Sequence, residues 1–190
     1  NFNENMMNPL NQLSPRISAS YNVNDALSIN ANWGIYYQLP PYTTIGYRSE
    51  EGEFINTDIT YIQSQHYVLG AAYLLDINAR VSVEGFYKKY NNYPFLYPDS
   101  ISLANLGGDF GVIGNRPAES INEGRAYGLE ITYEQKLYRG WFGILAITLV
   151  RSEFQDMNFE YVPSSWDNRY ITTLTFGKKF GKNWQIGAQY

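Results

Sequence analysis

The sequence predicts an all-β fold, a segment of an antiparallel transmembrane β-barrel with about eight long strands, short periplasmic turns and long extracellular loops. Three observations lead to this prediction. Apolar and polar residues alternate over long stretches, which is the period of a strand with one apolar face. Short turns alternate with long polar loops along the chain. Tyrosine accounts for 18 of the 190 residues, and amphipathic rings favour the membrane interface.

The clearest hairpin lies in residues 124–152, where two long stretches flank a turn at Arg139-Gly140. The stretch YGLEITYE, from Tyr127 to Glu134, alternates between less polar and more polar side chains. Each stretch has about 10 residues or more, whereas strands of soluble proteins usually have about 5–6. A tilted strand needs about 9–11 residues to cross a bilayer. The hairpin therefore has the length of a membrane-spanning unit.

The first predicted hairpin follows a patternless polar stretch, residues 1–14, which we expect to be a loop. A strand begins at Pro15, and residues 17–23 alternate in polarity. Asn24 and Asp25 tolerate left-handed backbone angles and predict a tight turn. The next strand, residues 27–38, has the cleanest alternation in the chain. A helix does not explain this pattern, because a period of two would spread apolar residues around its circumference.

The remaining strands continue the same organisation. A long polar loop is expected at residues 39–58, then strands at residues 59–75 and 79–90, and a second long loop at residues 91–123. After the hairpin described above, a loop is expected at residues 153–163 and a last pair of strands at 166–180 and 184–190. Short turns and long loops thus fall at opposite ends, which is typical of outer-membrane barrels. Aromatic residues near the short turns would line the membrane interface: Tyr21, Trp141, Phe180 and Trp184.

Composition excludes several classes of protein. The net charge of −4 argues against nucleic acid as a partner. The absence of cysteine removes disulfides, thiolate catalysis and zinc–thiolate sites. The mean hydropathy of −0.37 and the lack of a long apolar run exclude a helical membrane protein. A soluble sandwich or up-and-down barrel would explain the alternation, but not the strand length, the loop asymmetry and the tyrosine excess together.

Several segments resemble the barrel of a TonB-dependent outer-membrane receptor, especially receptors of Bacteroidota. The resemblance lies in an ordered set of patterned strands that covers nearly the whole chain, rather than in one invariant motif. The segments are LSPRISASYNVNDALSINANWGIYYQLPPY (13–42), EGFYKKYNNYPF (84–95), GRAYGLEITYEQKL (124–137), GWFGILAITLVRSEF (140–154) and SWDNRYITTLTFGKKFGKNWQIGAQY (165–190).

The resemblance implies a barrel of about 22 strands whose lumen is filled by a plug. Residues 1–190 would be part of the C-terminal half of that barrel, without the plug domain and the closing strands. The chain begins without Met and stops within a strand pattern, so we expect a piece of a longer protein. The implied location is the outer membrane of a bacterial cell. The implied partners are outer-membrane lipid, the protein's own plug domain, TonB acting through the N-terminal region, and an unknown small ligand.

The function that the resemblance implies is TonB-dependent uptake of a scarce ligand, such as a siderophore, cobalamin, a glycan or a peptide. The alternative is a passive porin or a structural barrel without a plug. No enzyme activity, catalytic residue, metal or cofactor is expected. The single histidine, His66, has no second nitrogen ligand for a metal and no evident partner for acid–base catalysis. Glu50, Glu51, Glu53 and Asp58 match no calcium-loop template, and the glycine-rich residues 107–114 lack the strand and helix of a phosphate site.

The best candidates for ligand binding are aromatic residues of the predicted loops. Exposed rings offer stacking faces for glycans or aromatic chelates. The alternative is that these rings pack the loops together or complete the outer aromatic band. The candidates are Tyr42, Tyr47, Tyr93, Phe95, Tyr97, Phe110 and Trp166.

Four charged residues fall on the polar side of the predicted strands and would line the lumen. Charge that is removed from water needs a partner. We therefore expect these side chains to pair with the plug or with neighbouring strands, in a structural or gating role. They are Arg80, Glu84, Glu130 and Arg169.

Overall fold

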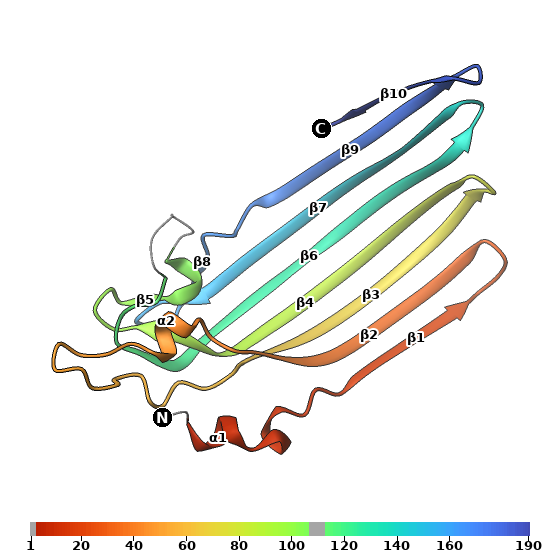
Figure 1. Cartoon of the computed structure of the whole chain (residues 1–190). Helices are drawn as coiled ribbons and strands as arrows, with labels where there is room; N and C mark the ends of the chain where they lie inside the picture. Colours follow the sequence, from red (N-terminus) through yellow and green to blue (C-terminus); the bar gives the residue numbers. More distant parts are fainter. Residues whose placement is uncertain (1–2, 107–112) are drawn as a thin grey trace.

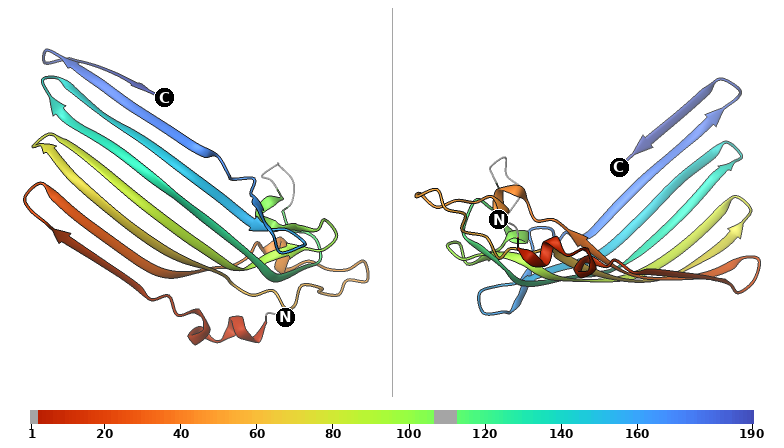
Figure 2. Two further views of the ribbon diagram at one scale, coloured as in Figure 1. Left: turned by 180° about the vertical axis from the view of Figure 1, so that it is seen from behind. Right: turned by 60° about the horizontal axis from the view of Figure 1, so that its bottom comes forward.

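The structure is a computed structural model that describes residues 3–106 and 113–190. The described residues form ten strands of one antiparallel sheet (Figure 1). The sheet is curved like a piece of barrel wall (Figure 2). The strands are β1 (Arg16–Asn22), β2 (Leu27–Gln38), β3 (Ile62–Asp76), β4 (Ala79–Leu96), β5 (Ile101–Ser102), β6 (Ala118–Tyr138), β7 (Trp141–Gln155), β8 (Tyr161–Pro163), β9 (Arg169–Phe180) and β10 (Trp184–Gln189).

The strand order follows the chain, as expected for consecutive hairpins. The path is β1-β2-β3-β4-β6-β7-β9-β10, and the short strands β5 and β8 pair with β4 and β7 at the loop end. Every pair is antiparallel. The path has eight strands, joined by short turns at one end and by long loops at the other, which confirms the predicted fold class.

Tight turns close the hairpins at one end of the sheet (Figure 1). Arg139 and Gly140, between β6 and β7, have φ angles of 49° and 86°, which suits a two-residue hairpin turn. Between β1 and β2, the side-chain oxygen of Asn24 accepts hydrogen bonds from the amides of Ala26 and Leu27. This end corresponds to the periplasmic end of the expected barrel.

Aromatic rings form a row across the outer face of the sheet towards its loop end. Trp33, Tyr67, Tyr87 and Tyr127 occupy paired positions on β2, β3, β4 and β6. The ring centroids of Tyr67 and Tyr87 are 6.4 Å apart, as are those of Tyr87 and Tyr127. A second set of exposed aromatics lies near the tight turns. Two aromatic bands that flank an apolar zone are what a membrane-spanning barrel requires.

Three strands extend into stretches that were expected to be loops, and one of them is β7, which runs to Gln155 although the loop was expected from residue 153. β4 continues to Leu96 and β6 begins at Ala118, although residues 91–123 were expected to be a loop. Asn92 has a φ of 58°, and the pairing with β6 shifts register between Tyr90 and Tyr93. The asparagine therefore makes a bulge, after which the strand continues, instead of ending the strand.

The best-buried apolar cluster of the described chain lies among the long loops. Ile59, Leu96, Leu103 and Ala118 are almost inaccessible and pack together. The side chain of Asn56 bonds to the carbonyl oxygens of Thr44 and Arg116 and to the amide of Ala118. The loops between β2 and β3 and between β4 and β6 therefore form one packed body, which we call the loop cap.

The described helical segments are short and lie before β1 or within the loops (Figure 1). None of them has the length and apolar character needed to cross a membrane. They are α1 (Glu4–Met7), the 3-10 turn η1 (Pro9–Gln12), α2 (Tyr42–Ile45) and the 3-10 turn η2 (Leu103–Asn105).

Candidate ligand-binding recess

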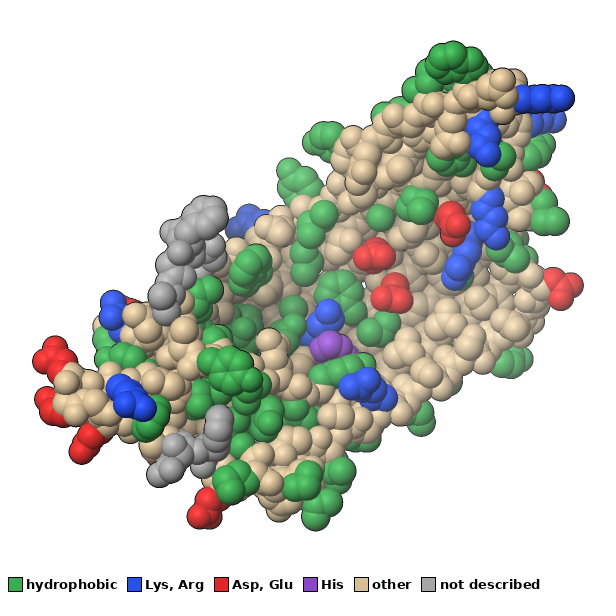
Figure 3. All heavy atoms as spheres, viewed as in Figure 1, with side chains coloured by type: hydrophobic (Ala, Val, Ile, Leu, Met, Phe, Trp, Pro, Cys, Tyr) green, Lys and Arg blue, Asp and Glu red, His purple; other side chains and the backbone are tan. Residues whose placement is uncertain are grey.

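An aromatic recess opens on the concave face of the sheet, beside the loop cap. Its volume is about 650 Å³. Figure 3 views this face and shows apolar side chains gathered at the loop end. The recess is lined by Tyr36, Tyr37, Gln38, Ile62, Ser64, His66, Tyr90, Tyr93, Ala104, Ser152, Phe154 and Trp166.

Strand register produces the aromatic wall of this recess. Tyr36, Ser64, Tyr90, Gly124 and Phe154 occupy one row of paired positions across β2, β3, β4, β6 and β7. Because paired residues share a face of a sheet, all five lie on the concave side. Their strands place them on the polar side of the alternation, so these rings interrupt a polar face.

Phe154 packs against neighbouring aromatic rings and is only 4% exposed. Its ring stacks on Tyr90 at 5.5 Å and meets Tyr93 edge-on at 4.8 Å, between ring centroids. A Cβ at position 124 would approach a ring carbon of Phe154 to 2.3 Å. Only glycine at this position leaves room for the ring, so Gly124 shapes the wall.

A strip of basic side chains follows the aromatic row on the same face. Arg16, His66 and Lys88 lie in one paired row through Gly34. The ring of Tyr36 has the Arg16 guanidinium 4.4 Å from its centroid and the His66 ring at 4.4 Å. His66 Nε2 is 2.7 Å from the hydroxyl of Ser64. Within the described chain, neither Arg16 nor Lys88 has a carboxylate within 4 Å.

Trp166 lies on the loop side of the recess. Its side chain remains largely exposed, although it lines the recess. The side chain of the next residue, Asp167, is buried and bonds to the end of β7. The recess thus combines three features: packed rings in its wall, one open ring above them, and unpaired cations beside them.

The structure distributes the predicted loop aromatics over different surroundings. Tyr93 and Trp166 line the recess. Phe95 is buried and meets Tyr97 edge-on, and Tyr93 and Phe95 belong to β4 rather than to a loop. The hydroxyl of Tyr97 donates a hydrogen bond to Glu119, which raises the pKa of Tyr97. Among the remaining candidates, Tyr42 is highly exposed, Tyr47 is partly buried, and Phe110 lies outside the described residues.

The predicted lumenal charges lie on the concave side of the register. Glu84 and Glu130 are directly paired across β4 and β6. Glu130 accepts hydrogen bonds from Thr132 and Thr148. Among the described residues, neither carboxylate has a cation within ion-pairing distance. Arg169 is different, since its Nε lies 3.9 Å from Asp167.

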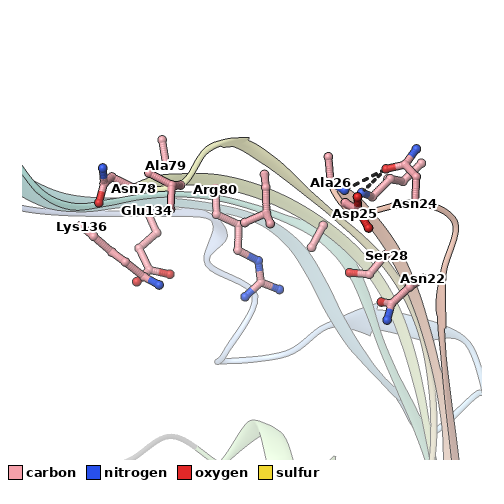
Figure 4. Close-up of a pocket in the computed structure, with 14 residues that line it drawn as sticks. Asn22, Asn24, Asp25, Ala26, Ser28, Asn78, Ala79, Arg80, Glu134 and Lys136 are labelled. Carbon is pink, nitrogen blue, oxygen red and sulfur yellow. Dashed lines mark hydrogen bonds between the residues drawn. The ribbon is translucent and has the colours of Figure 1, made fainter.

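A second recess lies near the tight turns and is polar. It has a volume of about 790 Å³. Figure 4 shows Arg80, Glu134 and Lys136 projecting towards the concave side, opposite Asn22 and Ser28. These side chains come from β4, β6, β1 and β2. The concave wall therefore carries aromatic, basic, acidic and mixed charged zones in order from the loop end to the turn end.

Sequence reasoning missed Tyr36, Tyr90 and Phe154 as members of a site. Tyr36 and Tyr90 were expected in strands, and Phe154 was expected in the loop at residues 153–163. The available signal was a large ring on the polar side of each strand's alternation. No arrangement of three or more metal-ligating side chains occurs among the residues that the structure describes.

Comparison with known families identifies the wall. The profile of the family described as "TonB dependent receptor-like, beta-barrel" matches residues 2–190. The chain belongs to this TonB-dependent receptor family. Its predicted all-β barrel fold and its location in the bacterial outer membrane are thereby confirmed.

Solved structures of TonB-dependent receptors contain the same curved wall. The chain is similar to the ferric-catecholate import receptor Fiu from K12 E. coli, with 15% identity over 92% of the chain and a TM-score of 0.64. It is similar to the ferripyoverdine receptor of Pseudomonas aeruginosa, with 17% identity over 93% and a TM-score of 0.63. It is also similar to the FrpB iron transporter from Neisseria meningitidis, with 13% identity over 93% of the chain and a TM-score of 0.63.

The chain spans about a quarter of the length of these solved receptors, namely 23%, 22% and 26%. At these identities the likeness concerns the fold. All three are described as receptors or transporters, and none as an enzyme. A search of curated protein sequences finds no match.

Proposed function

We propose that the complete protein is a TonB-dependent receptor that captures a scarce ligand at the cell surface and passes it through its barrel. The observation that carries this proposal is the aromatic recess at the loop end of the concave wall. Packed rings and a few polar groups in a concavity are the usual composition of a small-molecule site. In an outer-membrane barrel this position is the outer mouth of the lumen.

The recess gives each of its zones a role in binding. The rings of Tyr90, Tyr93 and Trp166 would contact apolar or planar parts of the ligand. The hydroxyl of Ser64 and the amide of Gln38 would fix its orientation through hydrogen bonds. We assign ligand contact to these groups rather than to Tyr42, which lies away from the recess lining. The candidate ligands are siderophores, cobalamin, glycans and peptides.

The proposed partner inside the barrel is the protein's own plug domain. Glu84, Glu130 and Arg80 face the lumen without an ion pair in the described chain. Charges in a water-poor interior require opposite charges. A plug whose surface carries cations opposite the two glutamates and carboxylates opposite Arg80 would satisfy them. On this proposal residues 1–190 form part of the C-terminal half of the barrel, and TonB acts on the plug through the N-terminal region.

Uptake by cells tests the proposal. The complete gene is expressed in a bacterial strain with or without TonB, and uptake of labelled ferric siderophores, cobalamin, oligosaccharides and peptides is measured. We expect one class of compound to be taken up, and only when TonB is present. Phe154→Ala should reduce that uptake at least tenfold, whereas Phe180→Ala on the outer face should leave it unchanged.

The same measurement separates the receptor from the alternative. A passive porin would take up small solutes equally with and without TonB, and Phe154→Ala would have little effect on the rate. That result would overturn the proposal.

A further inference from the structure

The ring of Trp166 is unusual because it is presented to solvent by a rigidly bonded turn. The residue is 63% exposed, yet it lines the aromatic recess. An exposed tryptophan at the end of a loop would ordinarily sample several rotamers on a fast timescale. The surrounding hydrogen bonds show how the backbone below this ring is held.

Two serines attach the turn to the end of β7. The amide of Ser164 donates to the carbonyl oxygen of Ser152 at 2.8 Å, and the two hydroxyls lie 2.8 Å apart. The amide of Trp166 donates to the hydroxyl of Ser164 at 3.2 Å. Both serines are buried. The backbone that carries the tryptophan is therefore bonded to the sheet on its N-terminal side.

A buried carboxylate attaches the other side of the turn. The side chain of Asp167 is only 4% exposed. It accepts a hydrogen bond from the amide of Ser152 at 2.9 Å and from Arg151 Nη1 at 3.1 Å. Arg169 Nε lies 3.9 Å from the same carboxylate. The backbone amide of Asp167 donates to the carbonyl oxygen of Ser164 at 3.0 Å, which closes the turn.

The charge balance at Asp167 favours a fixed position. A buried carboxylate is stable only when charged or dipolar groups replace its water. Here two guanidinium groups and one backbone amide converge on it, and hydrogen bonds to an ionised acceptor are stronger than neutral ones. Both hydrogen-bond donors come from β7, and Arg169 at the start of β9 adds a longer ion-pair contact, so the carboxylate is held at the junction of the two strands directly beside Trp166.

We propose that Asp167 is a positioning residue that holds the Trp166 ring over the recess before any ligand arrives. This inference rests on the proposed function, in which Trp166 contacts the ligand. A ring that is already fixed loses less conformational freedom on binding, so preorganisation improves affinity without adding a contact. The recess is then a prepared surface with one open aromatic face.

The competing explanation is that Asp167 only supports the β7–β9 pairing. In that case its removal would loosen the whole edge of the sheet, including distant residues. A positioning role predicts a change that is confined to the recess. A probe on Trp166 and a second probe on the same strand pair therefore distinguish the two explanations.

The test measures ring motion in the complete, ligand-free receptor in detergent. One protein retains Trp166 as its single tryptophan, with Trp33, Trp141, Trp184 and any other tryptophan of the complete receptor replaced by Phe. A second protein retains only Trp141, which lies at the opposite end of β7. Time-resolved fluorescence anisotropy gives the amplitude of fast ring motion in each. Asp167→Asn is introduced into both, and Asp99→Asn, which removes the Arg116–Asp99 ion pair of another loop, serves as the matched control.

We expect Asp167→Asn to raise the amplitude of fast Trp166 motion at least twofold, with Trp141 unchanged. Asp99→Asn should change neither. Unchanged Trp166 motion in the Asp167→Asn protein would overturn the proposal, and so would an equal change at Trp141. If Asp167→Asn prevents folding, Arg151→Met, which removes one of the two hydrogen-bond donors, is used with the same expected and opposing outcomes. Since no ligand is present, this result is independent of the uptake measurement that tests the function.

Discussion

The ring of Phe154 lies over the backbone of Gly124, where a Cβ would come within 2.3 Å of a ring carbon. The contact joins β6 and β7 at the wall of the recess. It also explains why a glycine occupies a strand interior, where it otherwise weakens pairing. The bulky ring of Phe154 can be buried here because the residue opposite it has no side chain.

Gly124→Ala should displace the Phe154 ring and destabilise the protein. Forcing a methyl group into a packed site costs about 1–3 kcal/mol. The control is Gly85→Ala, because a Cβ there meets its nearest heavy atom, a backbone oxygen, at 3.9 Å. Equilibrium unfolding of the complete protein in denaturant measures both. Equal stability of the two variants would show that the ring relaxes elsewhere at no cost.

Asn56→Ala should open the loop cap. The amide side chain makes three hydrogen bonds to backbone groups of two loops. Each buried group left without a partner costs about 1–3 kcal/mol. Hydrogen exchange measured by mass spectrometry should become faster in residues 42–61 and 113–118 of the variant than in the unsubstituted protein, with exchange in the strands unchanged. Asn158→Ala, at an exposed loop position, should leave exchange in both segments unchanged. Equal exchange rates in the two variants would contradict the role of Asn56 in holding the loop cap together.

The turn at residues 156–160 should loosen in acid. Backbone hydrogen bonds, first from the amide of Glu160, lower the pKa of Asp156. A carboxyl whose pKa is lowered by folding contributes stability above its unfolded pKa of about 3.9 and loses it as the pH falls through the folded value. The methyl resonance of Met157, in ¹³C-labelled protein, should therefore shift below about pH 3.9. In Asp156→Asn that acid-dependent shift should disappear; its persistence would assign the transition to another group.

Ile131→Arg should be costly, and Thr132→Arg should be tolerated. The register places Ile131 on the outer face, opposite Val83 and Ile147, and its neighbour Thr132 on the concave face. A charge at the lipid-facing midplane of a barrel costs about 2–4 kcal/mol. Folding of the complete protein into lipid vesicles, titrated with urea, measures the difference. The reverse order of stabilities would mean that the faces are exchanged.

Glu130→Gln should have effects of opposite sign with and without the plug. In the wall alone, Glu84 and Glu130 are like charges in paired positions, which is destabilising by about 0.2–1 kcal/mol. Removing one charge should stabilise a plug-deleted barrel by that amount. In the complete protein the same variant should be destabilising, because a cation of the plug loses its partner. Glu53→Gln in the loop is the control, and effects of the same sign in both proteins would remove the case for pairing.

Most of the wall was predictable because it follows a local rule. In β2, the alternation from Leu27 to Gln38 predicts the strand, and the structure confirms its bounds. The end of β4 was not predictable in this way. Asn91, Asn92 and Pro94 resemble a turn in sequence, but Asn92 forms a bulge and the chain continues to Leu96. The strand continues because Leu96 packs in the buried cluster of the loop cap.

The recess was less predictable, because it depends on register between distant strands. Tyr36, Tyr90 and Phe154 are separated by more than 50 residues from one to the next. Each is an ordinary aromatic until the pairing aligns all three in one row. Tyr93 and Trp166 were predicted to be loop aromatics, although Tyr93 lies in β4, and no local pattern shows that they meet at one cavity. The face of the sheet on which Arg80, Glu84, Glu130 and Arg169 lie was easier to predict, since alternation alone assigns it.

The loop cap has a consequence for immune recognition of the bacterial surface. Asn56 and the buried cluster hold together segments that lie about 60 residues apart in sequence. An antibody against the native cap would therefore bind a discontinuous epitope, and a synthetic peptide copied from residues 39–61 would not reproduce it. Immunisation with the folded receptor, rather than with its individual loops, is the route to antibodies that recognise living cells.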